Sequence, residues 1–99
     1  MSEHPWTILI AERGFIFAGR VHREGDRVVL DDAYVVRRYC LETKDGLGGL
    51  AARGPTQGND ILDAAPLGIG VYVFGVLGDF PCDQTAWATW HAGQTRAKK

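Results

Sequence analysis

Alternating apolar and polar residues over the first forty positions predict a series of short β-strands. The first of these segments places Trp6, Ile8 and Ile10 on one side, the period of two that is typical of a half-buried strand. Short polar or glycine-containing turns separate the segments, so we expect an antiparallel meander in which Asp31 and Asp32 form a break. The expected strands are residues 6–12, 15–22, 27–30 and 33–39.

Gly19 lies inside the second expected strand. A glycine in a strand interior is typical of a bulge or sharp bend where a sheet curls. Residues 23–26 follow as a hairpin turn in which Gly25 supplies the left-handed position. A bent glycine strand followed by the segment DRVVLDDAY resembles the opening of a small SH3-like or Sm-like barrel, over about the first two fifths of the chain.

The second half of the chain predicts two helices and one further strand. Gly54 is expected at the C′ position of the first helix, and Pro55 prevents its continuation. Asp83 is expected to cap the second helix, and Gly93 to stop it. The expected elements are a helix over residues 47–53, a loop over 66–70, a nearly fully buried strand over 71–77 and a helix over 84–91.

These elements predict a mainly β protein with minor α content. We expect a small curled antiparallel sheet or SH3/Sm-like barrel, with a short helix after the fourth strand and a C-terminal helix. The length of 99 residues fits one domain, which we place at residues 1–93, followed by a disordered basic tail at 94–99. A domain of this size buries only a small hydrophobic core, so self-association would add to its stability.

Charge and cysteine content narrow the classes of function. The net charge of −1 gives no global attraction for nucleic acid or an anionic membrane. The opening MSEHPWTILI lacks the basic and apolar regions of a signal peptide, and no apolar run is long enough to cross a bilayer. Cys40 and Cys82 are far apart and form no CxxC motif, which predicts an intracellular protein with two unlinked thiols. Neither cysteines nor histidines show metal-ligand spacing, so no metal or cofactor is expected.

The segment GLGGLAARGPTQGND, residues 46–60, resembles two nucleotide-binding motifs. As a dinucleotide fingerprint it would need a surrounding βαβ unit, and a meander precedes it instead. As a P-loop it would need lysine where Pro55 stands. We therefore interpret it as a tight helical connector, in which Leu47 and Leu50 plug the barrel, or as an anion-binding loop.

The anion-binding alternative depends on backbone N–H groups and nearby cations. Glycine-rich backbone at a helix start exposes N–H groups that favour anions. Arg37 and Arg38 would point to opposite faces of a strand, so at most one of them faces this loop. Tyr39 could stack on a base. The candidate ligand-binding residues are Arg38, Tyr39, Gly46, Gly48, Gly49, Arg53 and Thr56.

Trp87, Trp90 and His91 share one face of the last expected helix. Three interpretations stay open for this face. The indoles could cover the open end of the barrel as core, form a contact with another subunit, or stack on nucleic-acid bases. We treat the three residues as a candidate interface.

Several segments together resemble a family of small uncharacterised proteins encoded mainly by bacteriophages and prophages. The family commonly has Trp-Gly where this chain has Tyr39-Cys40. The resemblance implies a phage origin and a small β-rich domain, and it implies no particular activity. The matching residues are Gly14, Ile16, Phe17, Gly19, Arg20, Leu30, Asp32, Ala33, Arg38, Tyr39, Gly46, Leu47, Leu50, Ala51, Gly54, Pro55 and Thr56.

The sequence thus leads to a non-enzymatic phage accessory protein in the host cytoplasm, or in the virion. We expect a homo-oligomer that binds a phosphate-bearing nucleotide, such as a host defence signal. The first alternative is a structural or assembly protein of the virion. The second alternative is RNA binding by an Sm-like ring.

Overall fold

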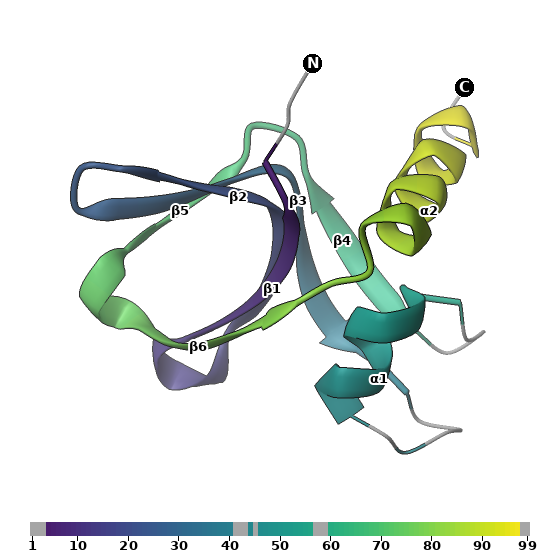
Figure 1. Cartoon of the computed structure of the whole chain (residues 1–99), viewed down its shortest axis with the longest axis horizontal. Helices are drawn as coiled ribbons and strands as arrows, with labels where there is room; N and C mark the ends of the chain where they lie inside the picture. Colours follow the sequence, from purple (N-terminus) through teal and green to yellow (C-terminus); the bar gives the residue numbers. More distant parts are fainter. Residues whose placement is uncertain (1–3, 41–43, 45, 57–59, 98–99) are drawn as a thin grey trace.

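The computed structural model describes residues 4–40, 44, 46–56 and 60–97. Within this part of the chain, six antiparallel strands form one curled sheet that does not close, and two helices lie outside it (Figure 1). This arrangement confirms the predicted mainly β fold. The elements are β1 (Trp6–Ala11), η1 (Glu12–Gly14), β2 (Ile16–Glu24), β3 (Arg27–Arg38), α1 (Gly46–Arg53), β4 (Ile61–Ala65), β5 (Ile69–Tyr72), η2 (Val73–Gly75), β6 (Val76–Pro81) and α2 (Gln84–Ala97).

The strand order is β4-β3-β2-β1-β6, and β5 also pairs with β3. β1, β2 and β3 form the predicted meander. β3 is long enough to serve two partners along one edge, because Leu30 pairs with Ile69 of β5 and Ala33 pairs with Ala65 of β4. β6 returns to pair with β1, at the other end of the sheet.

The predicted break at Asp31 and Asp32 is wrong, because β3 runs through both residues. The strand continues through a bulge instead, where Asp32 adopts a φ of 50° and the β2–β3 register shifts between Ala18 and Arg20. Aspartate tolerates this left-handed conformation better than most residues. The strands expected over residues 27–30 and 33–39 are therefore the single strand β3. As a consequence, α1 follows the third strand and not the fourth.

Gly19 lies opposite this bulge, and its missing side chain lets the two strands approach. A Cβ at this position would lie 2.8 Å from the carbonyl oxygen of Asp31 and 3.1 Å from the Cβ of Leu30. The predicted bend at Gly19 is confirmed, since both strands change register there. The bend curls the sheet.

Curling gives the sheet two apolar faces. The outer face packs against both helices, with Trp6, Ile8 and Trp87 fully buried, while the inner face packs on itself around Leu9 and Leu30. β1 therefore contributes side chains to both clusters. Its predicted half-buried character is wrong because the curl encloses the face that an open sheet would leave to solvent.

The prediction of one buried strand over residues 71–77 is also wrong. β5 already begins at Ile69, inside the expected loop, and the 3₁₀ turn η2 separates it from β6. The turn carries Phe74 outward, so that its side chain is 77% exposed, and Tyr72 and Leu77 are exposed as well. A run of apolar residues does not reveal such a turn, because the residues of η2 are as apolar as those of the strands.

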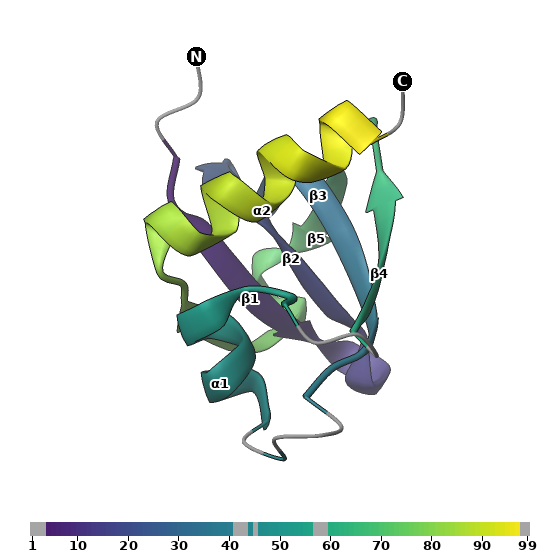
Figure 2. The same cartoon turned by 90° about the vertical axis from the view of Figure 1, so that its right-hand side faces the viewer.

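The two helices lie side by side against the outer face of the sheet (Figure 2). α1 forms over the predicted residues, and Gly54 takes the left-handed C′ conformation with a φ of 76°. The predicted plug of a barrel is wrong, because Leu50 is buried against the outer face of the open sheet. The indole N–H of Trp87 in α2 donates to the carbonyl oxygens of Leu50 and Ala51 at 3.2 and 3.1 Å. These bonds join α2 to the last turns of α1.

α2 begins as predicted, since the Ala86 backbone N–H donates to the Asp83 carboxylate at 2.9 Å. It continues to Ala97, so the predicted stop at Gly93 is wrong. A glycine inside a helix costs only about 1 kcal/mol, which the turns on either side overcome. Residues 94–97 are thus helical, and Lys98 and Lys99 lie outside the described residues. No described helix is long and apolar enough to cross a membrane.

The close approach at Gly19 gives a stability prediction. We expect Gly19→Ala to lower the free energy of unfolding by about 1–3 kcal/mol, because the added methyl group would collide with backbone. Gly78→Ala is the matched control, since nothing lies within 4 Å of a Cβ there, and it should change stability by less than about 0.5 kcal/mol. Urea unfolding measures both. Equal effects of the two substitutions would contradict this account of the bend.

Candidate functional site

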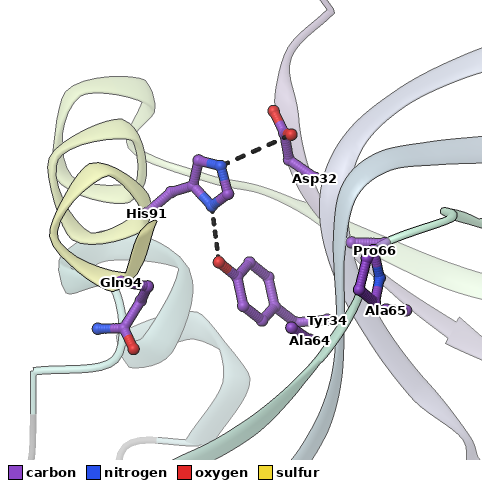
Figure 3. Close-up of a pocket in the computed structure, with 8 residues that line it drawn as sticks. Asp32, Tyr34, Ala64, Ala65, Pro66, His91 and Gln94 are labelled. Carbon is purple, nitrogen blue, oxygen red and sulfur yellow. Dashed lines mark hydrogen bonds and ion pairs between the residues drawn. The ribbon is translucent and has the colours of Figure 1, made fainter. Parts of the chain in front are cut away.

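A pocket of about 270 Å³ lies between α2, the middle of β3 and the end of β4 (Figure 3). β3 supplies its floor, the end of β4 supplies an apolar wall, and α2 closes the opposite side. Pocket residues therefore come from segments far apart in the sequence. They are Asp32, Ala33, Tyr34, Ala64, Ala65, Pro66, His91 and Gln94.

His91 connects two polar residues of β3 in this pocket. The Tyr34 hydroxyl lies 2.6 Å from His91 Nδ1, and His91 Nε2 lies 3.6 Å from Asp32 Oδ1. Figure 3 shows the imidazole between the phenol and the carboxylate. A phenol that keeps its proton donates to Nδ1, which places the imidazole proton on Nε2, toward Asp32.

The pKa of Tyr34 favours this direction of the hydrogen bond. Burial raises the pKa of the hydroxyl above the usual value for tyrosine, and the nearby Asp32 carboxylate raises it further. Both effects disfavour the phenolate. The ring is also held by packing, with its centroid 4.6 Å from that of Trp90. Tyr34 is therefore a fixed hydrogen-bond donor and a poor nucleophile.

Asp32 is positioned by the bulge and by Arg20. Its Oδ2 accepts from Arg20 Nε at 3.1 Å, and the guanidinium of Arg20 lies 5.0 Å from the centre of the Trp6 ring. The side chain of Asp32 is nevertheless 41% exposed, so a ligand can reach it. The result is a continuous polar chain, Arg20–Asp32–His91–Tyr34, which begins at the edge of the pocket and ends on its floor.

The remaining pocket surface is mostly apolar. Ala64, Ala65 and Pro66 carry no side-chain hydrogen-bonding group, and Gln94 adds one amide from α2. Among the described residues that line the pocket, none is lysine or arginine. The pocket therefore suits an uncharged, partly apolar group better than a phosphate.

The structure places the predicted ligand-binding residues away from this pocket, around α1 and the end of β3. Arg38 and Thr56 are exposed, and Tyr39 is half-buried against the core. Arg53 Nη2 lies 3.5 Å from Cys40 Sγ, so its guanidinium extends toward the protein. Gly46, Gly48 and Gly49 all lie in α1. None of these residues lines the pocket.

The candidate interface residues differ in position. Trp87 is fully buried, and Trp90 and His91 are half-buried. The core interpretation thus describes Trp87, while His91 belongs to the pocket. Sequence reasoning missed the partners of His91, because Tyr34 lies 57 residues earlier in the chain and Asp32 is expected in a break between two strands. Asp32 and Tyr34 are two residues apart within one strand, and this spacing is the signal in the sequence that could have related the two residues.

Both cysteines are buried and are not linked to each other by a disulfide. Burial raises the pKa of the Cys82 thiol to about 12, although a hydrogen bond from the Ile8 backbone lowers it in part. A thiol with such a pKa is almost fully protonated at neutral pH and reacts slowly. Cys82 is therefore a core residue.

Four apolar side chains in η1 and η2 or close to them in the sequence are more than half exposed. They are Phe15, Tyr72, Phe74 and Leu77. Tyr72 and Phe74 stack with a centroid distance of 5.5 Å, and residues of both 3₁₀ turns line a shallow depression beside them. Exposed apolar surface of this kind often marks contact with another molecule.

Comparison with known proteins gives no guide to the function of this chain, so the function is inferred from the site itself. No protein-family model matches the chain, and neither a curated protein nor a solved structure matches it. The relation to phage proteins stays a prediction from sequence motifs. A fold alone does not determine function, so any function must be argued from the site.

Proposed function

We propose that this protein is a non-enzymatic binding protein that holds the nucleobase of a small nucleotide-type ligand in the pocket between β3, β4 and α2. The observation that carries this proposal is the position of two accessible hydrogen-bonding groups, Asp32 and Gln94, beside an apolar wall. Ligand sites commonly combine a mostly apolar lining with a few placed polar groups.

The size of the pocket supports a ring-sized occupant. At about 270 Å³ it lies just below the range of roughly 300–1,000 Å³ in which whole drug-sized ligands bind. A single heterocycle fits this space better than a whole dinucleotide. The wall formed by Ala64, Ala65 and Pro66 offers contact to the face of such a ring.

The polar groups support a nitrogen heterocycle in particular. The Asp32 carboxylate accepts from N–H groups, and the Gln94 amide both donates and accepts. The same side-chain types pair with base edges in nucleic-acid recognition, where carboxylates accept from cytosine and glutamine pairs with adenine. The Tyr34–His91 hydrogen bond keeps the floor of the pocket rigid, so these side chains lose little conformational entropy when a ligand binds.

The proposed ligand is still a nucleotide, as expected from the sequence. Its site is the pocket between β3, β4 and α2 and not the glycine segment around α1. Because none of the described residues that line the pocket is lysine or arginine, we place the phosphate of a nucleotide outside it. Tyr34 and Cys82 both have raised pKa values, which supports binding without nucleophilic chemistry. Binding without turnover suits a protein that sequesters a nucleotide signal, and this is the role we propose.

Calorimetric titration with nucleosides and with linear and cyclic nucleotides tests the proposal. We expect at least one ligand to bind, and Gln94→Ala and Asp32→Asn each to weaken it about tenfold, because each removes one hydrogen bond worth about 1–1.5 kcal/mol. Asparagine tolerates the left-handed backbone at position 32, so the second variant keeps the bulge. Arg38→Ala is the control, and it should leave the affinity nearly unchanged.

Two outcomes would contradict this proposal. The first is no binding by any member of the panel. The second is binding that Arg38→Ala weakens and Gln94→Ala does not, which would place the ligand near α1, where the sequence predicted it.

A second candidate function is self-association through Phe15, Tyr72, Phe74 and Leu77. The exposure of these side chains favours it, because a small domain with little core gains stability when apolar surface is covered by a second copy. Light scattering tests this candidate. We expect a stable oligomer that Phe74→Ser dissociates without loss of fold, and a wild-type monomer at about 100 μM would contradict it, because standard-size specific interfaces reach far tighter affinities.

A further inference from the structure

A second polar cluster joins three neighbouring segments outside the pocket. His4 precedes β1, His22 lies on β2 and Asp31 lies on β3. Each residue offers one ligand atom, and these atoms all lie within 4.8 Å of one another. Asp31 is not a lining residue of the pocket, so this cluster is distinct from the nucleobase site proposed above.

Backbone contacts hold His4 beside the other two residues. The Val21 N–H donates to the Pro5 carbonyl oxygen at 2.9 Å, and Arg20 Nη1 donates to the His4 carbonyl oxygen at 3.5 Å. The rings of His4 and His22 stack, with centroids 4.3 Å apart. The first segment of the described chain is thus fixed against β2.

Glu24 determines which nitrogen of His22 faces the cluster. Its Oε2 lies 2.8 Å from His22 Nε2, a short hydrogen bond in which the imidazole N–H donates. A neutral imidazole carries one proton, so the lone pair is then on Nδ1. That atom lies 3.4 Å from Asp31 Oδ2.

His22 Nδ1 lies in an environment that a proton or a cation would stabilise. The atom is buried and makes no hydrogen bond to any described residue. In the tautomer fixed by Glu24, it presents a lone pair to a carboxylate that also carries lone pairs. This arrangement is repulsive unless a proton or a metal ion lies between the two atoms. A buried polar group without a hydrogen bond is costly and calls for such a partner.

We propose that His4, His22 and Asp31 bind a Zn²⁺ ion. Bond lengths of about 2.0–2.2 Å to a tetrahedral zinc place its ligand atoms about 3.3–3.6 Å apart, and the 3.4 Å between His22 Nδ1 and Asp31 Oδ2 matches this spacing. The ligand atom of His4 lies within 4.8 Å of the other two, so His4 is the third member of the ligand set. Two imidazoles and one carboxylate leave the fourth position open.

Glu24 acts as a positioning residue in this site. Zinc-bound imidazoles usually donate their second N–H to a carboxylate, which fixes the ring and the tautomer, and the His22–Glu24 hydrogen bond is such a contact. The ion would clamp the segment before β1 onto the β2–β3 hairpin. Stabilisation of the fold is therefore its expected effect.

Titration of the untagged full chain with Zn²⁺ tests the site, by calorimetry and by thermal unfolding. We expect one equivalent to bind and to raise the unfolding midpoint. Glu24→Gln should weaken binding about 10–100-fold, the usual effect of losing a supporting residue, and His4→Ala and Asp31→Asn should weaken it further. Asp79→Asn removes a comparable exposed carboxylate on β6 and should leave the affinity unchanged.

Co²⁺ absorption provides a second measurement that does not depend on stability. Visible bands of tetrahedral Co²⁺ that disappear in His4→Ala would support the site, and His4 is exposed enough for this variant to fold. The proposal is overturned if Zn²⁺ does not bind, or if His4→Ala and Asp31→Asn bind it as tightly as Asp79→Asn does.

Discussion

The close approach of β2 and β3 at Gly19 is the constraint on which the rest of the structure depends. Only a residue without a Cβ can lie there, since the nearest backbone oxygen is 2.8 Å from where that atom would be. The approach creates the bulge at Asp32 and Ala33, and the bulge curls the sheet. Two consecutive carboxylates then serve different clusters: Asp31 faces His22, and Asp32 reaches His91.

The curl also explains why a domain of 99 residues can hold two helices and a pocket. It encloses one face of the sheet around Leu9 and Leu30, which leaves the other face to pack the helices. Trp87 joins α2 to α1 through two hydrogen bonds, and the Asp83 cap fixes the start of α2. These contacts determine where His91 lies relative to β3.

Local patterns predicted the local structure well. The meander, the bend at Gly19, the C′ conformation of Gly54 and the cap at Asp83 each follow from a few neighbouring residues. The errors arose where distant contacts decide the outcome. Pairing with β4 and β5 keeps β3 continuous through Asp32, and residues on both sides of Gly93 carry α2 past it.

The candidate sites were harder to predict for the same reason. Tyr34 and His91 are 57 residues apart, and no spacing rule connects them. His22 and Asp31 meet only because β2 and β3 pair. Motif reasoning therefore favoured the glycine segment, which is contiguous in sequence and whose described residues do not line the pocket.

The bulge fixes a chain of polar contacts, Arg20–Asp32–His91–Tyr34, that begins at the edge of the pocket and ends on its floor. Long-range ¹H–¹⁵N correlation spectra of the imidazoles test it most directly, at a pH above the range in which histidine usually titrates. We expect one tautomer for His91, with the proton on Nε2 and Nδ1 as the acceptor from Tyr34. A proton on Nδ1, or averaged shifts from two interconverting tautomers, would contradict it.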